Sequence, residues 1–246
     1  MRHALLILAL LMTPQLSLAA TGAYPLDSAD IDLRSQASLQ RGARIFVNYC
    51  MGCHSAAYQR YGRMGRDIGL SDEQVTANLI LTDAKIGDLM KNAMSKDDAS
   101  RWFGAPPPDL SLVARSRGVD WLYTYLRTFY LDPTRPFGVN NAVFPQVGMP
   151  HVLWELQGWQ TPVYRTETDA EGNQHEVMER LQLVAPGTRT PGDYDRDMRD
   201  LVNFLAYTAE PVQLERKALG IKVLLFLILM TVVFYLLKKE YWRDIH

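Results

Sequence analysis

Both cysteines of this 246-residue chain lie in one short stretch, which reads NYCMGCHSA from Asn48 to Ala56. Two residues separate Cys50 from Cys53, and His54 follows directly. A zinc site takes four Cys or His ligands, and the sequence has no second cysteine pair to complete one. A thioredoxin-like pair is expected after a strand in a βαβ pattern, and no strand pattern precedes Cys50. A disulfide across two residues would close too small a loop to add much stability.

The fourth use of this pattern is covalent haem attachment. Two thiols add to the vinyl groups of haem, and the adjacent histidine binds the iron. The histidine in the fifth position separates this use from the other three. We therefore predict one covalently attached haem c, held by Cys50 and Cys53, with His54 as an axial ligand of the iron.

The first 20 residues have the pattern of a secretory signal peptide. A basic start at Arg2 is followed by an apolar run, a break at Pro14 and then small residues. The apolar run is too short to span a bilayer, which disfavours the alternative of a retained anchor. Export suits the haem prediction, because c-type haem is attached outside the cytoplasm in bacteria.

A second apolar segment, Leu219 to Leu237, carries one charge, Lys222, close to its start. At 1.5 Å per residue it crosses a hydrocarbon core of about 30 Å, and the lysine reaches the headgroups. A buried helix of a soluble protein is the competing interpretation. We predict a single transmembrane anchor at residues 218–238 and a short cytoplasmic tail at 239–246. Basic residues flank both ends, so only the signal peptide gives the orientation, with the body outside.

The remaining residues, 21–217, are long enough for one domain with a core and a cofactor. No linker-like change in composition divides them. Acidic residues slightly outnumber basic ones in this body. That balance argues against nucleic acid as a partner and permits a basic protein partner.

Helical periodicity predicts a mainly α body. Before the haem motif, residues at helical spacing share one face: Leu39, Gly42, Ala43, Phe46 and Cys50. Residues 193–211 predict a second helix with acidic residues near its start and a proline after its end, and residues 119–130 predict a third. Between residues 161 and 184, β-forming residues flank a turn-like segment, so we expect an inserted β-hairpin; a helix of low stability is the alternative.

A c-type haem also needs a second axial ligand from far along the chain, and a methionine there raises the reduction potential. Met149 lies between Gly148 and Pro150, in a stretch without helical periodicity. Most methionines fill cores instead, which is the alternative for any one of them. His151 is the serious rival as a ligand. The bend at Pro150 places the two side chains on different sides of the loop, so we predict Met149.

Four segments of the chain resemble the bacterial cytochrome c1 family, in the family's order and over nearly all of the chain after the signal peptide. They read RGARIFVNYCMGCHSAAYQRYGRM, GAPPPDLSLVARSRG, FPQVGMPHVLWELQG and FLAYTAEP, the last followed by the C-terminal anchor. The haem motif alone marks only a c-type cytochrome. The segment GAPPPDLS together with the terminal anchor is far more specific.

The resemblance implies that Cys50 and Cys53 hold the haem and that His54 and Met149 bind its iron. It also implies that the segment around Pro108 wraps the haem edge and that Arg117 lies near a haem propionate; a solvated arginine at a helix end is the alternative. Some family members have an extra disulfide, which this chain lacks. The loop that carries the second ligand must therefore be held by packing.

These expectations combine into a cytochrome c-like, mainly α haem domain with an inserted β-hairpin and a single C-terminal transmembrane helix. The resemblance implies that the protein passes single electrons from a Rieske iron–sulfur protein to a soluble or anchored c-type cytochrome, beside cytochrome b in a dimeric complex. The site would be on the periplasmic side of the bacterial inner membrane. No side chain is expected to make or break bonds, since the iron carries the electron.

Three other functions fit parts of the pattern. A different anchored monohaem cytochrome would deliver electrons to a terminal oxidase or reductase and would lack the b-type partner. A membrane-tethered haem sensor would need an open sixth site on the iron and would bind carbon monoxide when reduced. A thiol redox protein without haem would give no haem stain on a denaturing gel.

Overall fold

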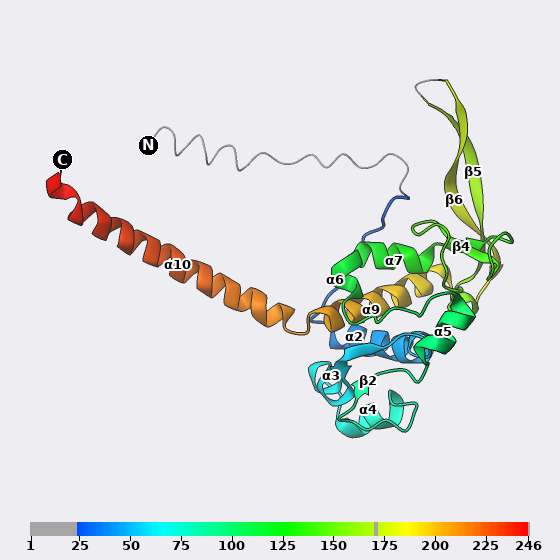
Figure 1. The fold of residues 1–246 in the computed structure, drawn as a ribbon, viewed down its shortest axis with the longest axis horizontal. Coiled ribbons are helices and arrows are strands. Elements are labelled where there is room, and N and C mark those ends of the chain that lie inside the picture. Colours follow the sequence, from blue (N-terminus) through cyan, green and yellow to red (C-terminus); the bar gives the residue numbers. More distant parts are fainter. Residues whose placement is uncertain (1–23, 170–171, 246) are drawn as a thin grey trace.

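The amphipathic helix predicted at residues 193–211 lies at the centre of the folded body. The computed structural model describes residues 24–169 and 172–245, and the signal peptide predicted at residues 1–20 lies outside them. In it this helix is α9 (Pro191–Ala209), which packs against α2 on one side and against α6 and α7 on the other (Figure 1). Thr190 caps its first turn by accepting a hydrogen bond from the Asp193 N–H, and Pro191 starts it.

The helix predicted before the haem motif is α2 (Gln36–Ile45), and it continues as the π-helical turn η1 (Phe46–Cys50). The predicted face is buried: Leu39, Gly42, Ala43, Phe46 and Cys50 all lie in the core. The Phe46 ring lies 5.6 Å from that of Phe204 on α9, centroid to centroid. Both predicted helices are therefore confirmed, and they pack together along their apolar faces.

The third predicted helix is shorter than expected. Helices α6 (Val113–Arg117) and α7 (Val119–Arg127) follow each other, and the chain then becomes strand β3 (Phe129–Leu131), paired antiparallel with β4 (Val139–Asn141). The prediction of helix up to residue 130 was wrong. Residues 128–130 are β-branched or aromatic, and the strand partner that decides their state lies ten residues further on.

The predicted hairpin is present and longer than expected. Strands β5 (Gly158–Thr168) and β6 (Gln174–Pro186) pair antiparallel along their whole length, so the alternative of a weak helix is wrong. Both strands project away from the helical body as a narrow arm (Figure 1). The described residues contain seven further short elements: β1 (Ala56–Arg60), α3 (Tyr61–Asp67), α4 (Asp72–Asn78), β2 (Leu89–Met90), α5 (Lys96–Phe103), α8 (Trp154–Gln157) and η2 (Arg243–Ile245).

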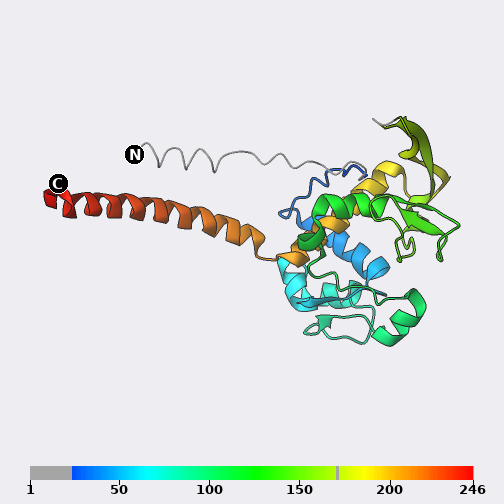
Figure 2. The same cartoon turned by 45° about the horizontal axis from the view of Figure 1, so that its top comes forward.

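Helix α10 (Gln213–Tyr241) leaves the body as a single rod on the side away from the hairpin (Figures 1 and 2). Its 29 residues give a length of about 43 Å. Among the described residues it is the one helix long and apolar enough to cross a membrane, and none of its apolar window is buried against the body. The interpretation as the core helix of a soluble protein is therefore wrong for this segment.

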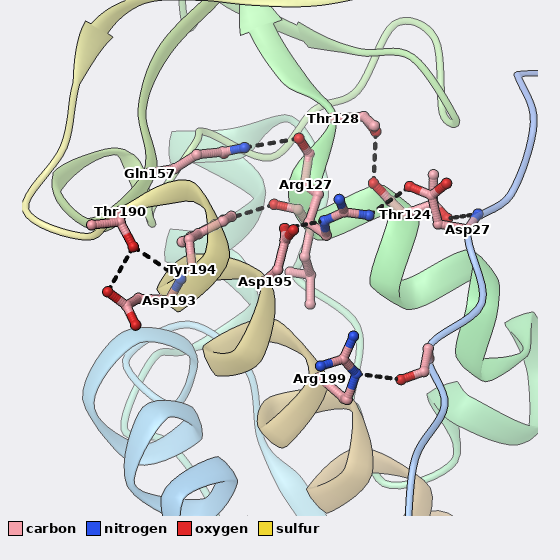
Figure 3. Close-up of polar contacts among 12 residues, drawn as sticks. Asp27, Thr124, Arg127, Thr128, Gln157, Thr190, Asp193, Tyr194, Asp195 and Arg199 are labelled. Atoms are coloured by element: carbon pink, nitrogen blue, oxygen red, sulfur yellow. Dashed lines mark hydrogen bonds and ion pairs between the residues drawn. The ribbon is translucent and has the colours of Figure 1, made fainter.

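A segment without regular structure, residues 24–34, ties α7 to α9. Arg127 on α7 forms ion pairs with Asp27 in this segment and, at 2.6 Å, with Asp195 on α9 (Figure 3). The Asp27 N–H donates to Thr124 Oγ1, and Arg199 Nε donates to a carbonyl of the segment. These bonds fix the position of α7 relative to α9.

Gly42 marks a point where α2 approaches α9 closely. A Cβ atom on this residue would overlap the backbone oxygen of Asp200 and lie 2.7 Å from Phe204 Cβ. Because neither group can rotate away, Gly42→Ala should destabilise the domain by about 2 to 3 kcal/mol or more, measured by denaturant unfolding. Gly192→Ala is the matched control, since it adds the same methyl group to α9 with no atom within 4 Å. Equal stability of the two variants would contradict the close crossing.

Candidate functional site

The two cysteines and the histidine lie on one turn at the end of η1. The N–H groups of Cys53 and His54 both donate to the Cys50 carbonyl, at 3.1 and 2.8 Å. The thiols are free, with Cys50 buried and Cys53 half-buried. These two bonds keep the three residues within one turn of the chain. A π-helical turn of this kind is rare and occurs frequently at functional sites.

The thiols are not set up for redox or zinc chemistry. Burial raises the pKa of Cys50 to about 12, so the group stays a neutral thiol, whereas a redox-active cysteine has a lowered pKa. No three His, Cys, Asp or Glu side chains in residues 24–169 and 172–245 converge as metal ligands would. A thiol redox pair and a zinc centre both fit this turn poorly.

His54 is oriented by a carbonyl on a distant loop. Its Nδ1 lies 2.7 Å from the oxygen of Pro108, 54 residues away. Because a carbonyl only accepts, Nδ1 carries the proton and Nε2 keeps a free lone pair. Burial also lowers the pKa of His54, which favours the neutral ring. A neutral imidazole, fixed by a bond at one nitrogen and free at the other, is the arrangement of a metal-binding histidine.

The proline-rich loop is fastened to the strand that follows the motif. Asp109 accepts the N–H groups of Ala57 and Ser111, both at 2.8 Å, and the Leu110 N–H donates to the Ser55 oxygen. These bonds and the Pro108 carbonyl hold the loop beside the cysteine motif. Pro108 itself has an exposed side chain and acts on His54 through its backbone.

Asn92 is a site residue that the sequence did not reveal. Its amide donates to the Cys53 carbonyl, and its N–H donates to Ser55 Oγ. Both bonds brace the chain on either side of His54. A single asparagine in a loop carries no motif, so nothing in the sequence alone singles it out.

Met149 lies in a second group of residues, built on β3, β4 and α7. Its sulfur accepts a hydrogen bond of 3.3 Å from the Tyr125 hydroxyl, and its side chain is half-buried against Phe129 and Val147. Burial raises the pKa of Tyr125, so the hydroxyl keeps its proton. A thioether has two lone pairs, and one remains for another partner.

Two buried asparagines hold the loop that carries Met149. Asn140 Oδ1 accepts the Gln146 N–H at 2.8 Å, and Asn141 Oδ1 accepts the N–H groups of Val143 and Phe144. We expected this loop to be held by packing. Packing is present, but side-chain amides also replace the missing backbone partners, as asparagine does in many turns.

His151 lies in a different environment from Met149. Its side chain is only 5% exposed, its ring stacks on Phe129 at 4.9 Å, and Trp159 meets it edge-on. Burial lowers its pKa to about 4. Aromatic rings thus pack around the imidazole, as they do around a histidine in a hydrophobic core.

Arg117 is exposed and lies over two aromatic rings. Its guanidinium carbon is 5.1 Å from the Trp121 ring centre and 5.6 Å from that of Phe144. Its side chain forms no ion pair or hydrogen bond with any residue that the structure describes. Trp121 stacks in turn on Tyr125, so Arg117 and Met149 are connected through two aromatic side chains.

The structure therefore brings the predicted residues together in two groups. One contains Cys50, Cys53, His54 and Pro108; the other contains Met149 and Arg117. No hydrogen bond or ring contact joins the two groups directly among the described residues. Both border the same hydrophobic core, against which Cys50, Leu110, Trp121 and Tyr125 pack.

Comparison with known proteins gives consistent matches. The model of the Cytochrome C1 family matches residues 31–245. A protein named cytochrome c1 from Allochromatium vinosum is 52% identical over 246 residues, covering 100% of both chains. A protein named ammonia monooxygenase gamma subunit from Nitrosomonas europaea is 50% identical, covering 98% of this chain and 97% of its own. A protein named cytochrome b/c1 from Bradyrhizobium diazoefficiens is 26% identical, covering 85% of this chain and 33% of its own.

The bonds made by Asp109 can be tested by mutation. Asp109→Ala should cost about 1 to 3 kcal/mol of unfolding free energy, because the buried Ser111 N–H loses its acceptor; Asp109→Asn should cost less. Denaturant unfolding measures both. Asp83→Ala serves as the control, since the exposed Asp83 has no hydrogen bond or ion pair with another described residue. If Asp109→Ala were as stable as this control, the loop would not depend on Asp109.

Proposed function

Because this chain belongs to the cytochrome c1 family, we propose that it passes single electrons from a Rieske iron–sulfur protein to a c-type cytochrome. As a family member it is a haem-containing, membrane-anchored electron-transfer subunit of a bc1 complex. The observation that carries the haem part of this proposal is the turn of Cys50, Cys53 and His54. There the bond to Pro108 leaves one imidazole nitrogen free.

The haem proposal assigns a task to each group of the site. Cys50 and Cys53 would attach one haem c through thioether bonds, and His54 Nε2 and Met149 Sδ would hold its iron. The bound haem supplies an iron that cycles between two oxidation states. The two free thiols, the neutral imidazole and the thioether with a spare lone pair together form a donor set that suits this cofactor.

The surrounding residues would control water and charge. The prolines before Asp109 have no N–H to solvate, so the loop suits a dry wall at the haem edge. Arg117 carries a charge that no described acidic side chain neutralises, and it would pair with a haem propionate. The aromatic rings beneath its guanidinium limit the positions that the charge can take.

The two apolar segments of the sequence support a proposal for the placement of the chain in the cell. We assign residues 1–20 to a signal peptide, 21–217 to the haem domain, 218–238 to the membrane anchor and 239–246 to a cytoplasmic tail. The haem domain would then lie on the periplasmic side of the bacterial inner membrane. Cytochrome b and the Rieske protein would be its neighbours in a dimeric complex, and the acceptor would be a soluble or anchored c-type cytochrome.

Covalent attachment predicts that the chain loses its haem when both cysteines are replaced. Replacing Cys50→Ser and Cys53→Ser together should abolish the haem stain of the chain on a denaturing gel, because both thioether bonds are lost. Met51→Leu, between the two cysteines, keeps both thiols and should keep the stain. Haem that still migrates with the denatured double variant would refute the attachment.

The proposed function predicts both the composition and the reactions of the native complex. Purified through a tag on the C-terminal tail, the chain should bring with it a b-type cytochrome and a two-iron cluster. Added quinol should reduce its haem, and an oxidised c-type cytochrome should reoxidise it. Purification with monooxygenase subunits and without a b-type haem would instead favour the activity named for the Nitrosomonas relative.

A further inference from the structure

The hydroxyl of Tyr125 contacts the sulfur of Met149. The Oη–Sδ distance is 3.3 Å, and only the hydroxyl can donate in this pair. The sulfur can accept this bond with one lone pair and still bind a metal with the other. Tyr125 therefore reaches the proposed ligand without competing for its place on the iron.

Neighbouring residues hold both Tyr125 and the loop of Met149 in place. The Tyr125 ring stacks on Trp121, with centroids 4.9 Å apart and planes 10° apart, and meets Phe129 edge-on at 5.1 Å. The Tyr125 carbonyl accepts from Asn141 Nδ2 at 2.8 Å, and Asn141 also holds the loop that leads to Met149. The donor and the acceptor thus share one rigid frame.

We propose that Tyr125 is a positioning residue that fixes the Met149 sulfur toward the haem iron and raises the reduction potential through its hydrogen bond. This inference rests on the proposed role of Met149 as an axial ligand. Packing gives the first effect, because the tyrosine restricts the rotation of a flexible thioether side chain.

The electronic effect has a defined direction. A hydrogen bond to the sulfur draws electron density away from it, so the sulfur donates less to the iron. The oxidised iron carries more positive charge and loses more stabilisation than the reduced iron does. The bond therefore favours the reduced state, as hydrogen bonds to metal ligands do in other redox centres.

Tyr125→Phe tests the proposal in the intact complex, since it removes the hydroxyl and keeps the ring that stacks on Trp121. The midpoint potential of this haem should fall, and the iron–sulfur charge-transfer band of the oxidised protein should shift or weaken. Redox titration and absorption spectroscopy measure the two effects, and neither is a turnover rate. An unchanged potential with an unchanged band would overturn the proposal.

The chain contains a matched control. The Tyr61 hydroxyl donates to Met51 Sδ at 3.4 Å in the core, and Met51 is not a proposed ligand. Tyr61→Phe removes the same kind of bond, so it should lower stability without moving the potential or the band. An equal fall in potential in both variants would show a general loosening of the core and would also overturn the proposal.

Two further variants separate this inference from the proposed function. Met149→Leu should abolish the charge-transfer band and His151→Ala should keep it. Survival of the band in Met149→Leu would refute the ligand itself. Loss of the band there, with no effect of Tyr125→Phe, would refute the role of Tyr125 alone. In the Met149→Leu background, Tyr125→Phe should no longer lower the potential.

A measurement on the unmodified protein covers the case in which Tyr125→Phe does not assemble. The hydroxyl proton exchanges with solvent, so the iron–sulfur stretching frequency should differ between H₂O and D₂O. Identical frequencies after full exchange would overturn the proposal.

Discussion

Helices α2 and α9 cross with almost no space between their backbones, and the position of the site depends on this crossing. Gly42 has no side chain to separate it from the Asp200 carbonyl, so Phe46, one turn further on, reaches Phe204. The chain then continues without a break into η1 and the turn that contains the cysteines. Because α9 is also tied to α7 through Arg127, the same helix positions the tyrosine that contacts Met149. One central helix thus sets the geometry of both groups of the site.

The two groups are held by different kinds of interaction. Around His54 most of the contacts involve the backbone. The carbonyl of Pro108 orients the ring, and Asp109 binds the loop that contains Pro108 to strand β1. Around Met149 the contacts are made by side chains, with asparagine amides below the loop and aromatic rings beside it. An imidazole needs a defined tautomer, which a carbonyl provides. A thioether has no proton to direct, so packing and a single donor are the means available to hold it.

The sequence predicted what depends on nearby residues and missed what depends on distant ones. Periodicity located α2 and α9 because the residues of their buried faces recur three and four positions apart along the sequence. The same method extended α7 too far, since β3 exists only through its pairing with β4. The haem motif identified Cys50, Cys53 and His54 as candidates, yet Asn92 and Tyr125 have no local signal. Their roles come from partners 39 and 24 residues away, which only the folded chain brings near.

The joint between α9 and the anchor bears on how such a domain can exchange electrons. Three residues, Glu210 to Val212, separate the two helices, and Glu210 accepts hydrogen bonds from Gln213 and Arg216 at the start of α10. A flexible tether that lets a domain search for partners needs many more residues, rich in glycine or serine. Here the helix that positions the site is joined almost directly to the helix that fits a membrane anchor. A short joint that is closed by these hydrogen bonds leaves the domain little freedom to move relative to α10.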